Sequence, residues 1–304
     1  MGQKEPKKGR RSGKLGNILL VAMFLIGLGL LTYPTISNYW NTRLHSQAIS
    51  GYDDSISQMT KRDFDAEWAK VDAYNREITE SGINFTPSAA ELDRYGKLLD
   101  PAGTGMMGHI EINKLAVDLP IYHTVDDPVL QVGIGHIPGT SLPGGGLGTH
   151  TVLSGHRGLP SSKLFTDLDA LDEGDTFLLH VLDRTLAYQV DQIRIVLPNE
   201  LDELRIDRDQ DYCTLVTCTP YAINTHRLLV RGHRVDYLDQ GYVAADAVRI
   251  DPVLVASIIS VPVFVVLFII LMVATAQRNR ENKRKQAAME KVGKRGDDAP
   301  SSQD

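Results

Sequence analysis

With 304 residues, 42% of them hydrophobic and 23% charged, the chain is large enough for one sizeable domain with appendages and too apolar for a disordered protein. Its charge is unevenly placed: residues 1–17 and 277–304 are basic, whereas the residues between them carry 18 basic against 32 acidic side chains, a formal charge of −14. This balance excludes nucleic acid as an expected partner, and solubility explains the acidity more simply than a basic protein partner does.

Two uncharged apolar runs lie near the ends of the chain. A basic tail, residues 1–17, precedes the run at residues 18–37, and the run at residues 253–276 precedes a second basic tail, residues 277–304. Each run has the roughly 20 residues needed to cross a bilayer. A cleavable signal peptide is the alternative for the first run, but no A-x-A site follows it. Because both flanks are basic, the positive-inside rule predicts a two-pass protein of the cell membrane, in contact with lipid, with cytoplasmic termini and an extracytoplasmic middle.

Residues 38–106 are predicted to form an extracytoplasmic helical stalk with a possible lid. Apolar residues recur there at steps of three or four, which is typical of an amphipathic helix: Phe64, Trp68, Val71, Tyr74 or Asn75, and Ile78. Turn-forming residues at positions 81–88 indicate a loop, and residues 89–98 are expected to form a second short helix.

Residues 107–240 have the residue pattern that is typical of an all-β domain. Short runs rich in Ile, Val, Leu, Thr and Tyr are separated by Gly, Pro and Asp: HIEI, DLPIY, HTVLSG, DTFLLHVL, LAYQVDQIRIVL, YCTLVTC and HRLLVRGHRV. Seven or more such strands predict a β-barrel or sandwich, which residues 241–252 link to the second apolar run.

The sequence gives no sign of a cofactor or a metal. The Gly- and Pro-rich segment at residues 138–148 is predicted to be a loop, and it lacks the G-K-[ST] of a phosphate-binding loop. Neither an HExxH motif nor paired CxxC motifs are present, so we expect no cofactor and no catalytic metal.

The chain has two cysteines, Cys213 and Cys218, in one predicted strand. An exported domain would normally join two cysteines in a disulfide. Five residue steps along a strand, however, put their Cα atoms roughly 16 Å apart, against a limit near 7 Å, and the odd spacing directs the two side chains to opposite faces. At least one is therefore expected to be a free thiol with a function, and two inert buried cysteines are the alternative.

Two further residues have the chemistry that a nucleophilic thiol needs. His156, in SGHRG, follows a predicted strand at residues 149–153, where an imidazole is well placed for proton transfer. Arg227 lies nine residues after Cys218, and its permanent charge could stabilise a developing oxyanion, although a salt bridge on the barrel surface would explain it equally well.

The segments GHIPGTSLPGGGLGTHTVLSGHRGLPSSKLFTDLDAL and TLVTCTPYAINTHRLLVRG, at residues 135–171 and 214–232, resemble the class C sortases, the pilus-assembling transpeptidases of Gram-positive bacteria. The resemblance extends from about residue 73 to residue 235. It implies a mainly β fold, a closed eight-stranded sortase-type β-barrel with N-terminal helices, flanked here by two transmembrane helices. It also implies that Cys218 is the nucleophile, His156 the acid and base, and Arg227 the residue that stabilises the oxyanion.

The activity implied by this resemblance is that of a cysteine transpeptidase of the thiol-protease type. Such an enzyme cleaves an LPxTG-like sorting signal of a pilin subunit between Thr and Gly, and transfers the acyl group from Cys218 to a lysine amine of another pilin. The alternatives are a sortase that anchors proteins to peptidoglycan, a cysteine hydrolase, and a non-catalytic membrane-tethered binding module.

Two features depart from the pattern of the family. Ala222 replaces the usual glycine of TPYG, and the aspartate–proline–aromatic lid sequence has no clean copy, because Asp100 and Pro101 are followed by Ala102. We expect a lid at residues 80–92 instead, with Phe85 and Pro87 as its candidate residues and Phe85 over the thiol.

Overall fold

The computed structural model describes residues 12–237 and 252–297. It divides the chain into two compact units. The first contains residues 12–35 of helix α1 (Ser12–Ser57) together with α5 (Pro252–Asp297), and the second contains the described residues from 36 to 237. The predicted linker 241–252 lies outside the described residues, except for Pro252.

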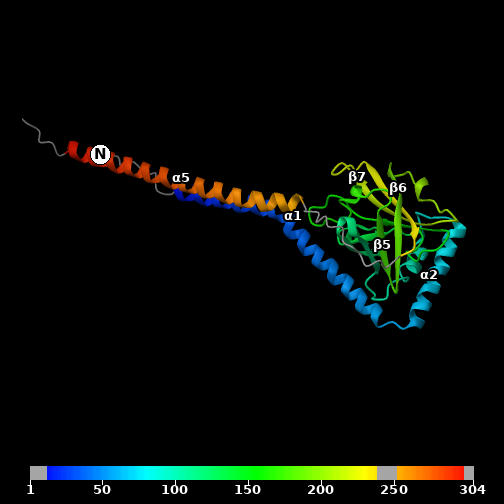
Figure 1. Ribbon diagram of the computed structural model, residues 1–304. Helices are drawn as coiled ribbons and strands as arrows, with labels where there is room; N and C mark the ends of the chain where they lie inside the picture. Colours follow the sequence, from blue (N-terminus) through cyan, green and yellow to red (C-terminus); the bar gives the residue numbers. More distant parts are fainter. Residues whose placement is uncertain (1–11, 238–251, 298–304) are drawn as a thin grey trace, which may run out of the picture. The chain divides into compact units, whose positions relative to one another are not determined.

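The first unit consists of the two apolar helices (Figure 1). Both are long and apolar enough to cross a membrane, with windows of mean hydropathy 2.1 and 2.9. The helices contact each other through aromatic rings: Phe24 stacks on Phe268 and Phe264 with ring centroids 3.9 and 5.5 Å apart. Both helices extend beyond the predicted runs, α1 to Ser57 and α5 into the basic tail at residues 277–297.

In the second unit, helix α2 (Lys61–Ser81) presents the face that the sequence predicted. A capping box between Thr60 and Asp63 starts this helix after a break at residues 58–60, so the helical pattern belongs to two helices. Phe64 is partly buried, and the other residues of the predicted face are buried: Trp68, Val71, Tyr74, Asn75 and Ile78. Helix α3 (Ala89–Tyr95) is three residues shorter than expected.

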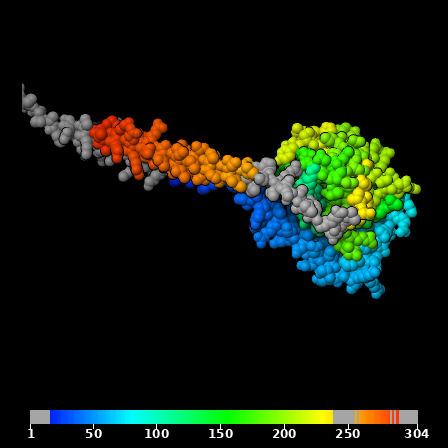
Figure 2. All heavy atoms as spheres, in the orientation of Figure 1, coloured from blue at the N-terminus to red at the C-terminus, as the bar shows by residue number. Residues whose placement is uncertain are grey.

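The second half of α1 packs against the barrel. The hydroxyl of Tyr52 donates a hydrogen bond to the carbonyl oxygen of Met107 at 2.9 Å and accepts one from the amide of Leu182 at 2.8 Å. Ile49, Tyr52 and Met106 form an apolar cluster at this contact. The surfaces of residues 36–57 of α1 and of α2, blue to cyan, border directly on the barrel (Figure 2). The segment predicted as a stalk is therefore part of the folded domain.

The strands form a closed barrel in the order β1-β2-β3-β4-β7-β8-β6-β5, as the resemblance implied. Neighbouring strands are antiparallel except for two parallel pairs, β2 with β3 and β4 with β7. The strands are β1 (Met106–Ile112), β2 (Val117–His123), β3 (Ile134–His136), β4 (Thr149–Ser154), β5 (Thr176–Val181), β6 (Arg184–Val196), β7 (Asp211–Thr219) and β8 (His226–Val235). The three-residue β3 was not among the predicted strands.

Short helical segments occupy the connections between the strands: η1 (Asn113–Leu115), α4 (Asp127–Leu130), η2 (Leu168–Ala170) and η3 (Asp202–Leu204). The Gly- and Pro-rich segment at residues 138–148 is a loop, as predicted. The side-chain amide of Asn75 on α2 holds this loop, since it accepts a hydrogen bond from the amide of Leu142 at 2.7 Å and donates one to the carbonyl oxygen of Leu142 at 3.1 Å.

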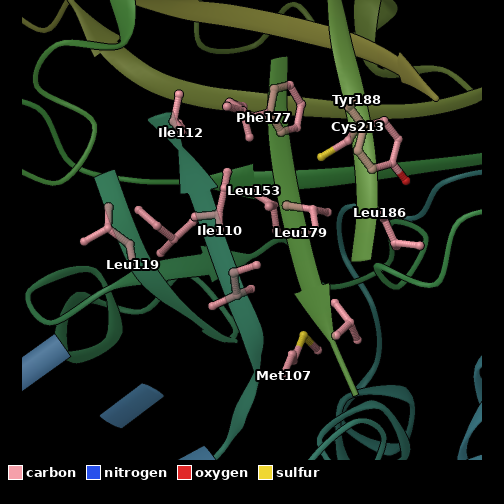
Figure 3. Close-up of a cluster of buried hydrophobic side chains, with 14 of the residues drawn as sticks. Met107, Ile110, Ile112, Leu119, Leu153, Phe177, Leu179, Leu186, Tyr188 and Cys213 are labelled. Carbon is pink, nitrogen blue, oxygen red and sulfur yellow. The ribbon is translucent and has the colours of Figure 1, made fainter. Parts of the chain in front are cut away.

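Inward-facing side chains of the strands fill the barrel (Figure 3). Phe177 and Tyr188 stack with ring centroids 5.6 Å apart, and Cys213 belongs to the same buried cluster. Complete burial of one large apolar side chain contributes about 1.5–3 kcal/mol, so this cluster supplies a rigid support for the strand ends.

Candidate active site

Strand β7 holds both cysteines as free thiols, and they lie in different surroundings. Cys213 is fully buried inside the barrel, whereas Cys218 is half-buried near the end of the strand. The predicted separation onto opposite faces is confirmed. Burial, with a smaller effect from Asp211, raises the pKa of Cys213 well above its usual value, so this thiol stays protonated and unreactive.

Strand β8 places Arg227 directly opposite Cys218 in the antiparallel β7–β8 pair. Directly opposed residues project from the same face, with Cβ atoms about 4.5–5.5 Å apart. The Nη1 atom of Arg227 donates hydrogen bonds to the carbonyl oxygens of His226 at 3.1 Å and Asn224 at 3.4 Å. A guanidinium has five N–H groups, which leaves donors for a bound oxyanion.

The hairpin between β7 and β8 contains the departure at Ala222. This residue has φ of +63°, in the left-handed region that glycine occupies without strain. A non-glycine residue there costs about 1–2 kcal/mol. The turn is held by hydrogen bonds from the amides of Ile223 and Asn224 to the carbonyl oxygen of Pro220, at 3.1 and 2.9 Å. The loop after the nucleophile therefore adopts its shape without the usual glycine.

Strand β4 brings His156 to the other side of Cys218. This strand runs parallel to β7, with Ser154 paired to Val216, and the amide of Gly155 donates a hydrogen bond to the carbonyl oxygen of Val216 at 3.0 Å. His156 follows Gly155 directly, so its segment leaves β4 beside the part of β7 that ends with Cys218 and Thr219. His156, Cys218 and Arg227 thus belong to three neighbouring segments, and Cys218 and Arg227 are directly paired.

Two other histidines, His136 and His150, are buried and hydrogen-bonded within the fold. His136 accepts a hydrogen bond from the hydroxyl of Tyr95 at Nδ1 and donates one from Nε2 to the carbonyl oxygen of Ser141, at 2.9 and 2.8 Å. His150 is buried between Thr214 and the carbonyl oxygen of Arg205. Burial lowers the pKa of each of these two imidazoles to about 4, so both are neutral at physiological pH.

The predicted lid segment lies between α2 and α3. Phe85 is half-buried and packs against an apolar cluster that includes Val152 and Val216, and Val216 is two residues before Cys218 on the same face of β7. The amide of Asn84 donates a hydrogen bond to the carbonyl oxygen of Gly139 at 3.1 Å. Gly139 has φ of +82°, and a Cβ there would lie 1.8 Å from the carbonyl oxygen of Asn84, so the approach requires glycine.

Pro87 is half-buried beside this contact. A hollow of about 510 Å³ opens between Phe85 and the segment at residues 201–208, which contributes Leu201 and Leu204 to its wall. The lid itself, with Phe85 over the thiol, stays a prediction.

The loop that carries His156 has contacts that the sequence did not predict. Asn41 donates a hydrogen bond from Nδ2 to the carbonyl oxygen of Ser161 at 2.7 Å, and the amide of Lys163 donates one to Oδ1 of Asn38 at 3.0 Å. Arg157, the neighbour of His156, contacts residues on two further segments. In the sequence, the only sign of such a role was the place of this arginine within SGHRG.

In the part of the chain that the structure describes, no group of three or more His, Cys, Asp or Glu side chains is arranged to hold a metal ion. The candidate site contains a thiol, an imidazole and a guanidinium, near the ends of the parallel pair β4–β7 and the antiparallel pair β7–β8. This combination suits nucleophilic acyl transfer by cysteine.

Residues 110–235 match the family model described as the Sortase domain. The structure is similar to sortase C1 from Streptococcus agalactiae, at 48% identity and a TM-score of 0.62, covering 63% of this chain and all of that one. It is also similar to sortase C from Streptococcus pneumoniae, at 42% identity and a TM-score of 0.54, covering 63% of this chain and 97% of that one. Sortase C from Clostridium perfringens SM101 is 40% identical, with a TM-score of 0.54 and coverage of 63% and 99%.

These similarities define a class of cysteine transpeptidase. The chain belongs to the sortase family, and its structural neighbours are class C sortases.

Proposed function

We propose that the protein is a pilus-assembling sortase that joins pilin subunits through a thioacyl intermediate on Cys218. The observation that carries the proposal is the direct pairing of Cys218 with Arg227, together with the hydrogen bond from Gly155 to Val216 that holds the segment of His156 beside β7. The similarity to class C sortases supports the choice of pilin, since the work on the Streptococcus pneumoniae enzyme concerns its pilin substrate specificity.

The first half of the reaction breaks the peptide bond between Thr and Gly of an LPxTG-like signal. The sulfur of Cys218 attacks the threonine carbonyl carbon, and the N–H groups of Arg227 stabilise the negative charge that develops on its oxygen. His156 then donates a proton to the departing glycine amine, which leaves a thioester on Cys218.

The second half forms an isopeptide bond. A lysine amine of another pilin attacks the thioester carbonyl, His156 accepts the amine proton, and Cys218 leaves as a thiolate. One peptide bond is exchanged for another, so no nucleotide and no cofactor are needed. Water is the competing acceptor, and exclusion of water from the thioester would favour transfer over hydrolysis.

The two apolar helices support a two-pass membrane topology with the barrel outside the cell and both termini in the cytoplasm. Protease treatment of intact protoplasts should cleave the barrel and leave both tails protected, and protected barrels would contradict this topology.

The proposal is tested by peptide cleavage and amine transfer with candidate sorting signals and a lysine-bearing pilin. Wild-type protein should form a thioacyl adduct on Cys218, visible by mass spectrometry, and pilin multimers. Cys218→Ala and His156→Ala should form neither, and a Cys218→Ala variant that still polymerises pilin would end the catalytic proposal and leave a binding module. Transfer only to a peptidoglycan amine would favour a wall-anchoring sortase, and cleavage without transfer would favour a hydrolase.

A further inference from the structure

Arg157 joins the segment of His156 to the segment of Cys218. Its Nη1 atom donates a hydrogen bond to Oγ1 of Thr219 at 3.2 Å, and its Nη2 atom forms an ion pair with Oδ2 of Asp169 at 2.5 Å. Thr219 directly follows the proposed nucleophile, and Asp169 belongs to η2. One guanidinium therefore connects three segments that come from distant parts of the sequence.

The burial of this guanidinium is costly. The Arg157 side chain is only 10% exposed, and within the described residues its Nε atom is buried without a hydrogen-bond partner. Removal of a cation from water is unfavourable unless its partners are well placed, and an unpaired buried donor adds to this cost. The cation of the other ion pair in this segment, Lys163 with Asp167, is more exposed than Arg157, at 35%.

Within the described residues, the hydrogen bonds that join this segment to β7 come from Gly155 and Arg157. The amide of Gly155 and its carbonyl oxygen are hydrogen-bonded to Val216 and to Oγ1 of Thr217, at 3.0 and 2.7 Å. Beyond Gly155, the carbonyl oxygen of His156 accepts a hydrogen bond from Phe165 at 3.2 Å, which is a contact within its own loop. The hydrogen bond from Arg157 to Thr219 is the next bond to β7, so bonds to this strand come from the residues directly before and directly after His156.

We propose that Arg157 is a positioning residue, which fixes the height of the His156 imidazole relative to the sulfur of Cys218. The planar fork of the guanidinium bonds Thr219 and Asp169 in one geometry, which the single ammonium group of a lysine cannot reproduce. This role rests on the proposed function, because it has meaning only where His156 transfers protons during attack at Cys218.

The test uses the full-length protein in detergent, a quenched fluorogenic LPxTG peptide, and hydroxylamine as the amine acceptor. The variants are Arg157→Gln, Arg157→Lys and Thr219→Val, and Lys163→Gln is the matched control, since it removes a cation from the same loop without touching β7. Activities are corrected for the folded fraction from thermal unfolding. The kcat, the KM and the dependence of kcat/KM on pH are measured for each protein.

We expect Arg157→Gln to lower kcat by roughly ten- to a hundredfold with little change in KM, because misplacement of a catalytic group by about 1 Å has effects of this size. Its pH profile should also change, and Arg157→Lys should be intermediate. Ethylguanidinium in solution should restore part of the rate of Arg157→Gln, which a purely structural loss would not allow. Lys163→Gln should match the wild type.

If Arg157→Gln does not fold, Thr219→Val still tests the contact, and a lowered kcat is expected for it as well. A kcat within twofold of the wild type for the folded Arg157→Gln protein, or for Thr219→Val, would overturn the positioning role. Loss of activity in Cys218→Ala and His156→Ala in the same assay would show that the proposed function survives that result. Retained activity in Cys218→Ala would instead remove the proposed function itself.

Discussion

Removal of the two asparagine contacts between α1 and the His156 loop should loosen that loop. Asn38 and Asn41 are one helical turn apart, and each makes one hydrogen bond to backbone in the segment Ser161–Lys163. A hydrogen bond between neutral groups contributes about 0.5–1.5 kcal/mol, so the pair should contribute about 1–3 kcal/mol to local stability. The double variant Asn38→Ala/Asn41→Ala should therefore open the loop about 5- to 150-fold more often.

Hydrogen exchange followed by mass spectrometry measures how often the His156 loop opens. The relevant amides are those of Phe165 and Thr166, which donate hydrogen bonds to the carbonyl oxygens of His156 and Lys163 within the loop. The amide of Lys163 loses its acceptor on Asn38 in the variant and should also exchange faster. Alanine has a higher helix propensity than asparagine, so α1 itself should not unfold. Any increase in exchange can then be assigned to the lost contacts.

The matched control is Thr42→Ala/Ser46→Ala. These hydroxyls bond only carbonyl oxygens of their own helix, those of Asn38 and Thr42, at 2.9 and 3.1 Å. Exchange in the loop should stay at the wild-type level in this protein. Unchanged exchange in the asparagine variant, or an equal rise in the control, would refute the idea that α1 holds the loop.

Two further predictions concern the buried histidine and the lid. His150 has a pKa of about 4 in the folded protein, below the ordinary value of 6.5, so below pH 6.5 only the unfolded chain takes up its proton. The contribution of His150 to the free energy of unfolding should fall by about 1.4 kcal/mol per pH unit from about pH 6.5 to about pH 4, alongside an equal contribution from His136, whose pKa is also about 4. Urea titrations should show a shallower slope for His150→Gln, and identical slopes would contradict this. If Phe85 covers the thiol, Phe85→Ala should speed the labelling of Cys218 by a thiol reagent while Leu201→Ala does not, and an unchanged rate for Phe85→Ala would remove the lid.

The sequence predicted the elements whose pattern is local. The buried face of α2 follows from apolar residues at helical spacing, and Trp68 and Val71 lie where that spacing places them. The opposite environments of Cys213 and Cys218 follow from the period of two in a strand. The closed eight-stranded barrel came from the resemblance and not from the pattern, which indicated only a barrel or a sandwich.

Features that depend on contacts between distant segments could not be predicted in this way. Strand β3 has only three residues. Its pairing with β2 and β4 defines it as a strand, whereas its composition does not. The parallel pairing of β4 with β7 brings the segment of His156 beside the strand of Cys218, and neither strand indicates this pairing by itself. The contacts of Asn38 and Asn41 connect residues about 120 positions apart, and no local pattern marks them.

Because the two cysteines differ in accessibility, the concentration of active protein can be measured by titrating one thiol. Cys213 is enclosed in the barrel and Cys218 is reachable, so a mild alkylating agent should modify the folded natural protein at one position without any engineered substitution. The stoichiometry of that modification would report the concentration of working enzyme in a preparation. Rates from different variants or membrane mimetics could then be placed on a common scale.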